Sequence, residues 1–329
     1  MLELIGLSYN MVRTFFIYLS KVSWAQRIIT NWKFAWRAAS RFVAGETVDA
    51  AIRIVRDLND RGFTVTLDHL GESTTTTEEA HNATQSILEL LSRTDQAKIR
   101  ANVSIKLTQI GLAVNYELCK SNLENILECA RHYGNFVRMD MEDTPFTDKT
   151  IELYHLMRKK GYENTGVVIQ SYLFRSESDV RALLEDNTRI RLVKGAYKEP
   201  PQLAFPRKSD VDNNYDLLAK LMIEHVHANK APGLSSDGRF PPIPAIATHD
   251  ARRIENAKKV LDTSGLPKES IEFQMLYGIR RDLQEECLRE GYSVRIYVPY
   301  GTHWYAYYMR RLAERPANVW FFASNFFRK

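Results

Sequence analysis

Eight short, mainly apolar stretches recur along the chain, with longer segments between them. The stretches cover residues 63–69, 101–107, 136–140, 166–170, 189–195, 243–249, 271–276 and 293–299. Each is bounded by polar residues, Gly or Pro. None of the stretches alternates strictly between apolar and polar positions. The absence of such alternation is typical of strands that helices cover. The pattern therefore predicts eight strands.

The segments before and between these stretches show the apolar spacing of amphipathic helices. Six of them cover residues 49–62, 76–94, 118–134, 149–162, 176–187 and 212–229. Several begin at Ser, Asp or Thr and end at Gly or Asn, which are residues that cap helices. A strand followed by a helix, repeated eight times, predicts an α/β fold: a (β/α)8 barrel of the TIM type.

No low-complexity linker divides the chain, and a barrel of this type usually takes roughly 250 residues. We expect residues 1–60 to form N-terminal helices that pack on the barrel, and residues 61–329 to form the barrel. The fold is thus expected to be one barrel with an N-terminal helical extension.

Composition is that of a folded globular protein, with 44% hydrophobic and 26% charged residues among 329. The net charge of +5 arises in residues 1–45, which hold six bases and one acid, whereas the remainder holds 39 of each. The bulk of the chain therefore gives no electrostatic reason to expect nucleic-acid binding.

Residues 1–45 mix aromatic residues with bases, and their longest uncharged run is far shorter than the roughly 18 apolar residues of a membrane span. Nor does the segment resemble a secretory signal. Two interpretations remain: amphipathic helices packed on the barrel, or a basic surface that contacts anionic lipid headgroups. Three cysteines without a CxxC pair favour a reducing compartment. We expect a cytoplasmic protein, with peripheral contact at the inner face of the plasma membrane as the sharper alternative.

Polar and charged residues gather where the predicted strands end, which in this fold is where active sites lie. Buried strands that end in titratable groups indicate a polar site, because such groups cost free energy unless they are paired. A metal site is poorly supported, since the motif HExxH is absent, and a nucleophile elbow GxSxG is absent too. The strand-end residues are Asp68, His69, Lys106, Asp140, Glu142, Gln170, Arg191, Lys194, Thr248, His249, Asp250, Gln274, Arg295 and Tyr297.

The bases Lys106, Arg191 and Lys194, together with Arg310 and Arg311, indicate an anionic ligand such as a carboxylate or a phosphate. The alternative is a solvated helix face on which Arg310 pairs with Glu314, four residues further on. Tyr307 precedes the arginine pair by three and four residues and so lies in the same sector of the predicted helix. This spacing favours an anion site with an aromatic wall.

Four motifs in order resemble the proline dehydrogenases, flavin enzymes that oxidise proline to 1-pyrroline-5-carboxylate. They are "RLVKGAY" at 191–197, "ATHD" at 247–250, "FQMLYG" at 273–278, and "RIYVPYG" leading to "YYMRRLAE". The likeness runs from about residue 60 to 315. It implies a (β/α)8 barrel that holds FAD noncovalently, with no metal.

The resemblance also implies roles for the matching positions. Asp140 and Arg191 would be catalytic, Arg191 lying near flavin N5. The substrate-binding residues would be Lys106, Arg310 and Arg311 on the carboxylate, with Tyr197, Leu276, Tyr297 and Tyr307 around the ring. The cofactor-binding residues would be Met141, Gln170, Arg191, Val193, Lys194, Gly195, Ala196, Thr248, His249, Gln274 and Glu314.

The implied function is the first step of proline catabolism to glutamate, with electrons passed to membrane quinone. The chain extends little beyond Glu314, so we expect the monofunctional form, and Lys198 stands where many bifunctional members have Trp. Two alternatives stay open. One is a flavin barrel that oxidises a related imino acid such as hydroxyproline, and the other is a non-redox protein that binds a carboxylate or phosphate.

Overall fold

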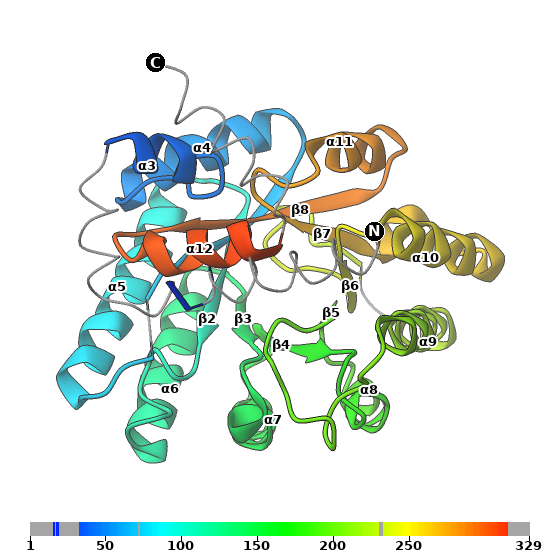
Figure 1. Cartoon of the computed structure of the whole chain (residues 1–329), viewed down its shortest axis with the longest axis horizontal. Coiled ribbons are helices and arrows are strands. Elements are labelled where there is room, and N and C mark those ends of the chain that lie inside the picture. Colours follow the sequence, from blue (N-terminus) through cyan, green and yellow to red (C-terminus); the bar gives the residue numbers. More distant parts are fainter. Residues whose placement is uncertain (1–15, 17, 20–32, 72, 230–232, 315–329) are drawn as a thin grey trace, which may run out of the picture.

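Eight parallel strands form a closed barrel in chain order, β1 to β8 (Figure 1). The computed structural model describes residues 16, 18–19, 33–71, 73–229 and 233–314. The strands are β1 (Thr64–His69), β2 (Ala101–Lys106), β3 (Val137–Asp140), β4 (Thr165–Gln170), β5 (Ile190–Val193), β6 (Pro244–Ala247), β7 (Glu272–Leu276) and β8 (Ser293–Tyr300). All eight predicted stretches are therefore strands, and the predicted fold class is confirmed.

Helices connect successive strands and cover the outside of the barrel. They are α5 (Thr77–Gln96), α6 (Tyr116–His132), α7 (Thr144–Lys159), α8 (Ser176–Glu185), α9 (Lys208–Asn229), α10 (Ala251–Ser264) and α11 (Arg281–Arg289). A short 3-10 helix, η1 (Lys268–Ser270), precedes β7. The predicted capping is seen at α5, where Thr76 and Glu79 form a reciprocal capping box.

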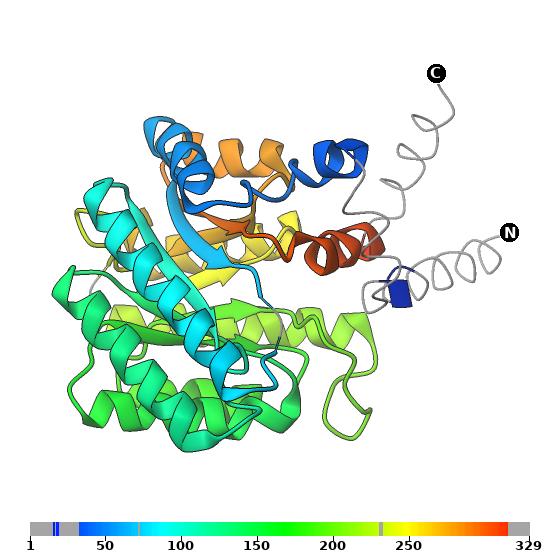
Figure 2. The same ribbon diagram turned by 90° about the vertical axis from the view of Figure 1, so that its left-hand side faces the viewer.

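The eighth position of the outer ring is filled from the N-terminal side of the chain. Helix α4 (Val48–Asp60) precedes β1 and packs against both β1 and β8. Helix α12 (Trp304–Glu314) follows β8 but packs against α3 (Lys33–Ala39), and it lies across the end of the barrel where the strands finish (Figures 1 and 2). The helix that bears the arginine pair is thereby held over the mouth.

The main apolar core lies between the strands and the surrounding helices. On β1, Val65 and Leu67 belong to this core, whereas Thr66 and Asp68 do not. The same alternation holds along the other strands, because successive side chains of a strand point to opposite faces. The interior is therefore lined mainly by polar groups: Thr66, Asp68, Asn102, Ser104, Lys106, Arg138, Asp140, Gln170, Arg191, Glu272, Gln274, Arg295 and Tyr297.

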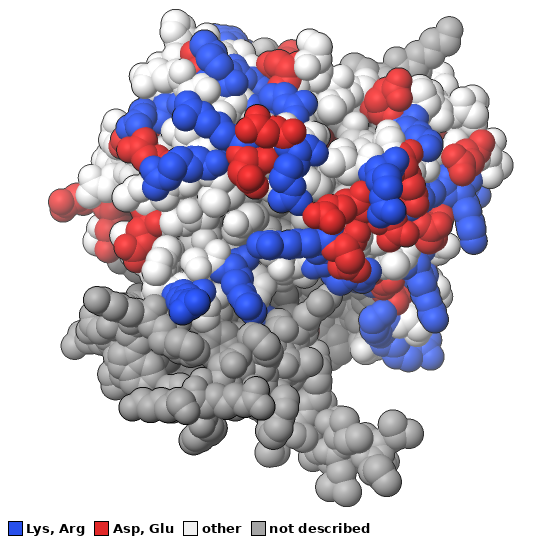
Figure 3. Space-filling view, turned by 90° about the horizontal axis from the view of Figure 1, so that it is seen from above, with Lys and Arg blue, Asp and Glu red and all other residues white. Residues whose placement is uncertain are grey.

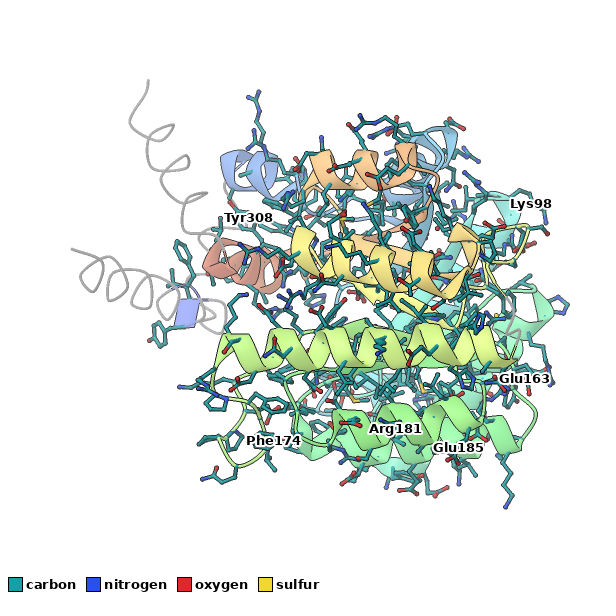
Figure 4. All side chains as sticks on the ribbon, turned by 90° about the vertical axis from the view of Figure 1, so that its right-hand side faces the viewer. Lys98, Glu163, Phe174, Arg181, Glu185 and Tyr308 are labelled. Carbon is teal, nitrogen blue, oxygen red and sulfur yellow. The ribbon has the colours of Figure 1, made fainter. Side chains whose placement is uncertain are left out.

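One end of the barrel is closed by the loop that leads into β6. The Gly238 carbonyl accepts a hydrogen bond of 2.8 Å from Arg295 Nη2, and the Arg239 carbonyl accepts one of 2.9 Å from Asn102. Gly238 has φ +71°, and a Cβ there would lie 2.7 Å from the methyl group of Thr64. This end is thus plugged, and the mouth under α12 is the opposite end. Figure 4 shows Tyr308 and Phe174 at the mouth end, with Lys98 and Glu163 at the other.

Most of residues 1–32 lie outside the described part of the chain, so both interpretations of this segment stay predictions, as does the boundary between residues 60 and 61. No helix among the described residues combines the length and apolar character needed to cross a membrane. On the face drawn in Figure 3, acidic and basic side chains are interspersed.

Candidate active site

Asp140, at the end of β3, gathers side chains from three other strands. Its Oδ1 accepts hydrogen bonds from Arg191 Nη1 at 2.7 Å and from Ser104 at 3.1 Å. Its Oδ2 accepts one from the Tyr297 hydroxyl at 2.7 Å. Burial, followed by the charge of Asp140, holds the pKa of Tyr297 well above its ordinary value, so this phenol stays a donor. The structure thus brings two predicted site residues, Arg191 and Tyr297, to the carboxylate of a third, Asp140.

Arg191 is oriented by two further contacts. Its Nε donates a hydrogen bond of 2.6 Å to Gln274 Oε1, and its guanidinium carbon lies 5.2 Å from the centre of the Tyr297 ring. The side chain is only 6% exposed. Within the described residues, Nη2 is the one nitrogen of this guanidinium that has no protein acceptor. Arg191 is therefore fixed through Nε and Nη1 and can still donate from Nη2.

Lys106 supplies a second buried cation beside Asp140. Its ammonium lies 3.1 Å from both oxygens of Asp68, whose side chain is 2% exposed. Burial alone would lower the pKa of Lys106, but the carboxylates of Asp68 and Asp140 outweigh it and raise that pKa above its ordinary value. Lys106 is therefore charged at neutral pH.

Tyr197 connects this cation with α12. Burial raises the pKa of its phenol to about 12, with a further contribution from Glu142, while Lys106 and Arg310 act in the opposite direction. Lys106 from β2 and Arg310 from α12 therefore lie within electrostatic reach of the same half-exposed ring. Arg310 itself is exposed and forms no hydrogen bond or ion pair with the described residues.

The remaining predicted substrate residues belong to α12 and the end of β7. Tyr307 is buried, and the Arg311 guanidinium carbon lies 5.1 Å from the centre of its ring. Leu276 packs against the apolar cluster that α3 and α12 share. The side chain of Glu314 lies outside the described residues, so its predicted role stays a prediction.

Several predicted flavin-binding residues are engaged with the protein itself. Lys194 donates hydrogen bonds to Asp212 and Asp250, the latter at 2.7 Å, so two carboxylates balance its charge. The Thr248 hydroxyl accepts a bond of 3.1 Å from the Asp250 amide. Nε2 of His249 accepts one of 2.9 Å from the Leu276 amide, which leaves the proton on Nδ1. These bonds fix the loops that follow β5, β6 and β7.

The others lie along the rim of the mouth. Gln170 is buried and donates a hydrogen bond of 2.9 Å to the Glu142 carbonyl. Met141, which precedes Glu142 in the chain, is also buried. Val193 ends β5, and Ala196 is exposed in the loop beyond it. Gly195 has φ +121°, and a Cβ there would lie 2.4 Å from the Tyr172 ring. Only glycine fits this approach, but contact with a cofactor stays a prediction for all five rim residues.

The prediction that Arg295 belongs to the mouth is wrong. Arg295 is fully buried and bonds to the closed end of the barrel through Gly238 and to Glu272 beside it. Sequence reasoning also gave no role to Ser104 or Glu272. The signal that identifies all three is the alternation of polar and apolar residues within each strand, which marks inward positions. Within the described residues, no three His, Cys, Asp or Glu side chains are placed to hold a metal ion.

Comparison with known proteins agrees with this geometry. The model of the family described as proline dehydrogenase matches residues 51–324. Proline dehydrogenase 2 of Bacillus subtilis is 38% identical over 94% of this chain and 96% of its own length. Proline dehydrogenase of Deinococcus radiodurans is 41% identical over 87% and 89%.

A crystal structure of proline utilization A (PutA) from Bdellovibrio bacteriovorus, inactivated by N-propargylglycine, superimposes with a TM-score of 0.77 at 27% identity. It covers 93% of this chain, which spans only 37% of that longer protein. One conclusion follows from the closed barrel, from Lys106 and Arg191 at its mouth, and from these relatives. The chain belongs to the proline dehydrogenase family and is an oxidoreductase that acts on proline.

Proposed function

We propose that this protein oxidises L-proline to 1-pyrroline-5-carboxylate with noncovalently bound FAD, as the first step of proline catabolism to glutamate. The observation that carries the proposal is the arrangement at the mouth. Arg191 is buried and held by Asp140 and Gln274, and one of its guanidinium nitrogens has no acceptor among the described residues. Lys106 and Arg310 both lie close enough to the Tyr197 phenol to act on it electrostatically.

These residues match the chemistry of the substrate. Proline has a carboxylate at one end and an apolar ring at the other, so its site needs cations beside an aromatic or aliphatic wall. Lys106, Arg310 and Arg311 would bind the carboxylate through charge-assisted hydrogen bonds. The wall would be formed by Tyr197, Leu276, Tyr297 and Tyr307.

The residues present also fit FAD. Arg191 offers an unbonded N–H on a rigid guanidinium, and it would place positive charge beside the flavin ring, as Lys194 would to a smaller extent because Asp212 and Asp250 balance it. Met141, Gln170, Val193, Gly195, Ala196, Thr248, His249, Gln274 and Glu314 complete the proposed cofactor site. When bound, FAD supplies the two-electron oxidant that converts the CH–NH of proline to C=N.

The test is an absorbance spectrum of the purified protein before and after anaerobic addition of proline. We expect a bound-flavin spectrum that proline bleaches, with 1-pyrroline-5-carboxylate as product. A protein that neither contains nor takes up FAD would instead be the non-redox binding protein considered above. Faster bleaching by hydroxyproline than by proline would show that a related imino acid is the substrate.

We further propose that the electrons pass to membrane quinone, and that residues 1–45 hold the protein at an anionic membrane surface. The support is the charge of this segment, six bases against one acid. Flotation with anionic vesicles compares the full chain with a chain lacking residues 1–45. Equal binding of both forms would exclude this role of the segment.

A further inference from the structure

A continuous series of hydrogen bonds runs through the barrel from the mouth to the closed end. It begins at Tyr297, Asp140 and Arg191 and continues from Arg191 to Gln274. Gln274 Nε2 then donates a bond of 2.6 Å to Glu272 Oε1, deeper in the interior on the same strand. Glu272 is 0% exposed, so bulk solvent does not screen its charge.

The carboxylate of Glu272 determines which way the Gln274 amide faces. A carboxylate only accepts hydrogen bonds, so the amide nitrogen must point to Glu272 and the amide oxygen to Arg191. The reversed amide would place its N–H groups against the guanidinium and its oxygen against a carboxylate oxygen. The orientation that Arg191 requires is thus imposed from below.

Glu272 is itself anchored by Arg295. Arg295 Nε lies 2.8 Å from Oε1 of Glu272, and Nη2 lies 3.0 Å from Oε2. The same guanidinium donates bonds of 2.8 Å to the carbonyls of Val65 and Gly238, so it is tied to β1 and to the plug at the closed end. The series of hydrogen bonds therefore ends on backbone carbonyls, which cannot change rotamer as side chains can.

Stability alone is a weak reason for this pair. A fully buried ion pair is often no more stabilising than apolar residues of the same volume, because both charges lose their hydration. The interior of a barrel of this type is usually filled by branched apolar residues. The Glu272–Arg295 pair loses hydration free energy on burial, yet it is connected to Arg191 through Gln274. Its presence is better explained by the orientation that it imposes on Arg191.

We propose that Glu272 and Arg295 are a positioning pair which orients Gln274 and, through it, sets the Arg191 guanidinium against the flavin. This inference rests on the proposed function, since Arg191 is given its place beside the cofactor there. Neither residue of the pair touches substrate in this proposal. Their effect is expected on the oxidation step and on the flavin, and not on the capture of the carboxylate by Lys106 and α12.

The first test is the double variant E272L/R295M, which removes the pair without changing the net charge. With FAD bound, we expect kcat to fall by about tenfold or more while the KM for proline stays within about twofold. The midpoint potential of the bound flavin should become more negative, since a less ordered Arg191 places less positive charge beside it. Wild-type kcat together with a wild-type potential would overturn the proposal.

If the double variant does not fold, Q274M decides instead, because it leaves the Glu272–Arg295 ion pair intact and removes the amide that joins this pair to Arg191. The same fall in kcat and the same direction of potential shift are expected. A Q274M protein with wild-type values of both would refute the positioning role.

A matched control is K258M on α10, which removes another buried base, bonded to Glu255 and Glu290 outside the barrel interior. It should lower the melting temperature without altering kcat or potential. A K258M protein that lost kcat and potential as the pair variants do would show a general stability effect and overturn the proposal. A wild-type protein that proline does not bleach would contradict the proposed function itself, whereas equal wild-type and variant values contradict only this inference.

Discussion

The Tyr297 hydroxyl donates a 2.7 Å hydrogen bond to Asp140 across the mouth of the barrel, from β8 to β3. These strands are not neighbours, because β1 and β2 lie between them, so the bond crosses the interior of the barrel. The other oxygen of the same carboxylate accepts from Arg191 and Ser104. Asp140 is therefore the point at which four strands of the barrel are linked, and its replacement should affect both stability and activity.

Replacing Asp140 by Asn should lower stability by about 2 to 4 kcal/mol, because the buried Arg191 loses its counter-charge and one donor faces an amide N–H. We also expect kcat to fall by at least about tenfold, since Arg191 is no longer held. Denaturant unfolding and steady-state kinetics measure the two effects. The milder Tyr297→Phe removes one hydroxyl and leaves Asp140 bonded to Arg191, so it should cost only about 1 kcal/mol. Equal costs for the two variants would mean that Asp140 is not the linking group.

The two arginines of α12 should respond differently to replacement by Met. Arg310 is exposed and bonds to none of the described residues, so Arg310→Met should leave stability within about 0.5 kcal/mol of wild type. Arg311 is half-buried over Tyr307, so Arg311→Met should also destabilise the fold. Both should raise the KM for proline by about tenfold or more, because each removes a charge-assisted partner of the carboxylate. A normal KM in both variants, with flavin retained, would exclude α12 as the carboxylate site.

His69 should make the protein sensitive to mild acid. Burial lowers the pKa of its imidazole below the ordinary value, with His303 adding to the effect and Asp68 opposing it. As pH falls below about 6.5, the unfolded chain takes up a proton that the folded chain resists, so stability falls. Above that pH the contribution is fully present. His69→Phe keeps a ring beside Tyr300 and should flatten the loss between pH 7.5 and 5.5 in denaturant unfolding. If the stability of this variant depends on pH as that of the wild type does, groups other than His69 cause the acid sensitivity.

The strands and the mouth were predictable because short-range patterns determine them. Residues 63–69 were expected as a strand and β1 covers Thr64–His69, since the capping residues and turns around it are local signals. Lys106, Asp140 and Arg191 were expected at the site because strand ends of a barrel converge.

Pairing across the barrel was not predictable, because it depends on register and on rotamers far apart in sequence. Gln274 and Asp140 both approach Arg191, but 83 and 51 residues separate them from it along the chain. The depth of Arg295 was missed for a related reason: its place relative to the mouth depends on where β8 pairs with β1 and β7. The position of α12 over the mouth depends in the same way on a distant segment, because α4, which precedes β1, occupies the place in the outer ring beside β8.

The "FQMLYG" motif ends in a glycine whose role can be separated into backbone strain and steric contact. Gly278 has φ +77°, and a Cβ there would lie 1.8 Å from the Arg41 carbonyl oxygen. Gly265, at the end of α10, has φ +65° with no atom within 4 Å of such a Cβ. Gly265→Ala should therefore cost only about 1 kcal/mol of backbone strain, whereas Gly278→Ala should cost about 2 to 4 kcal/mol. Denaturant unfolding of both variants measures the difference, and equal losses would show that Arg41 moves aside without cost.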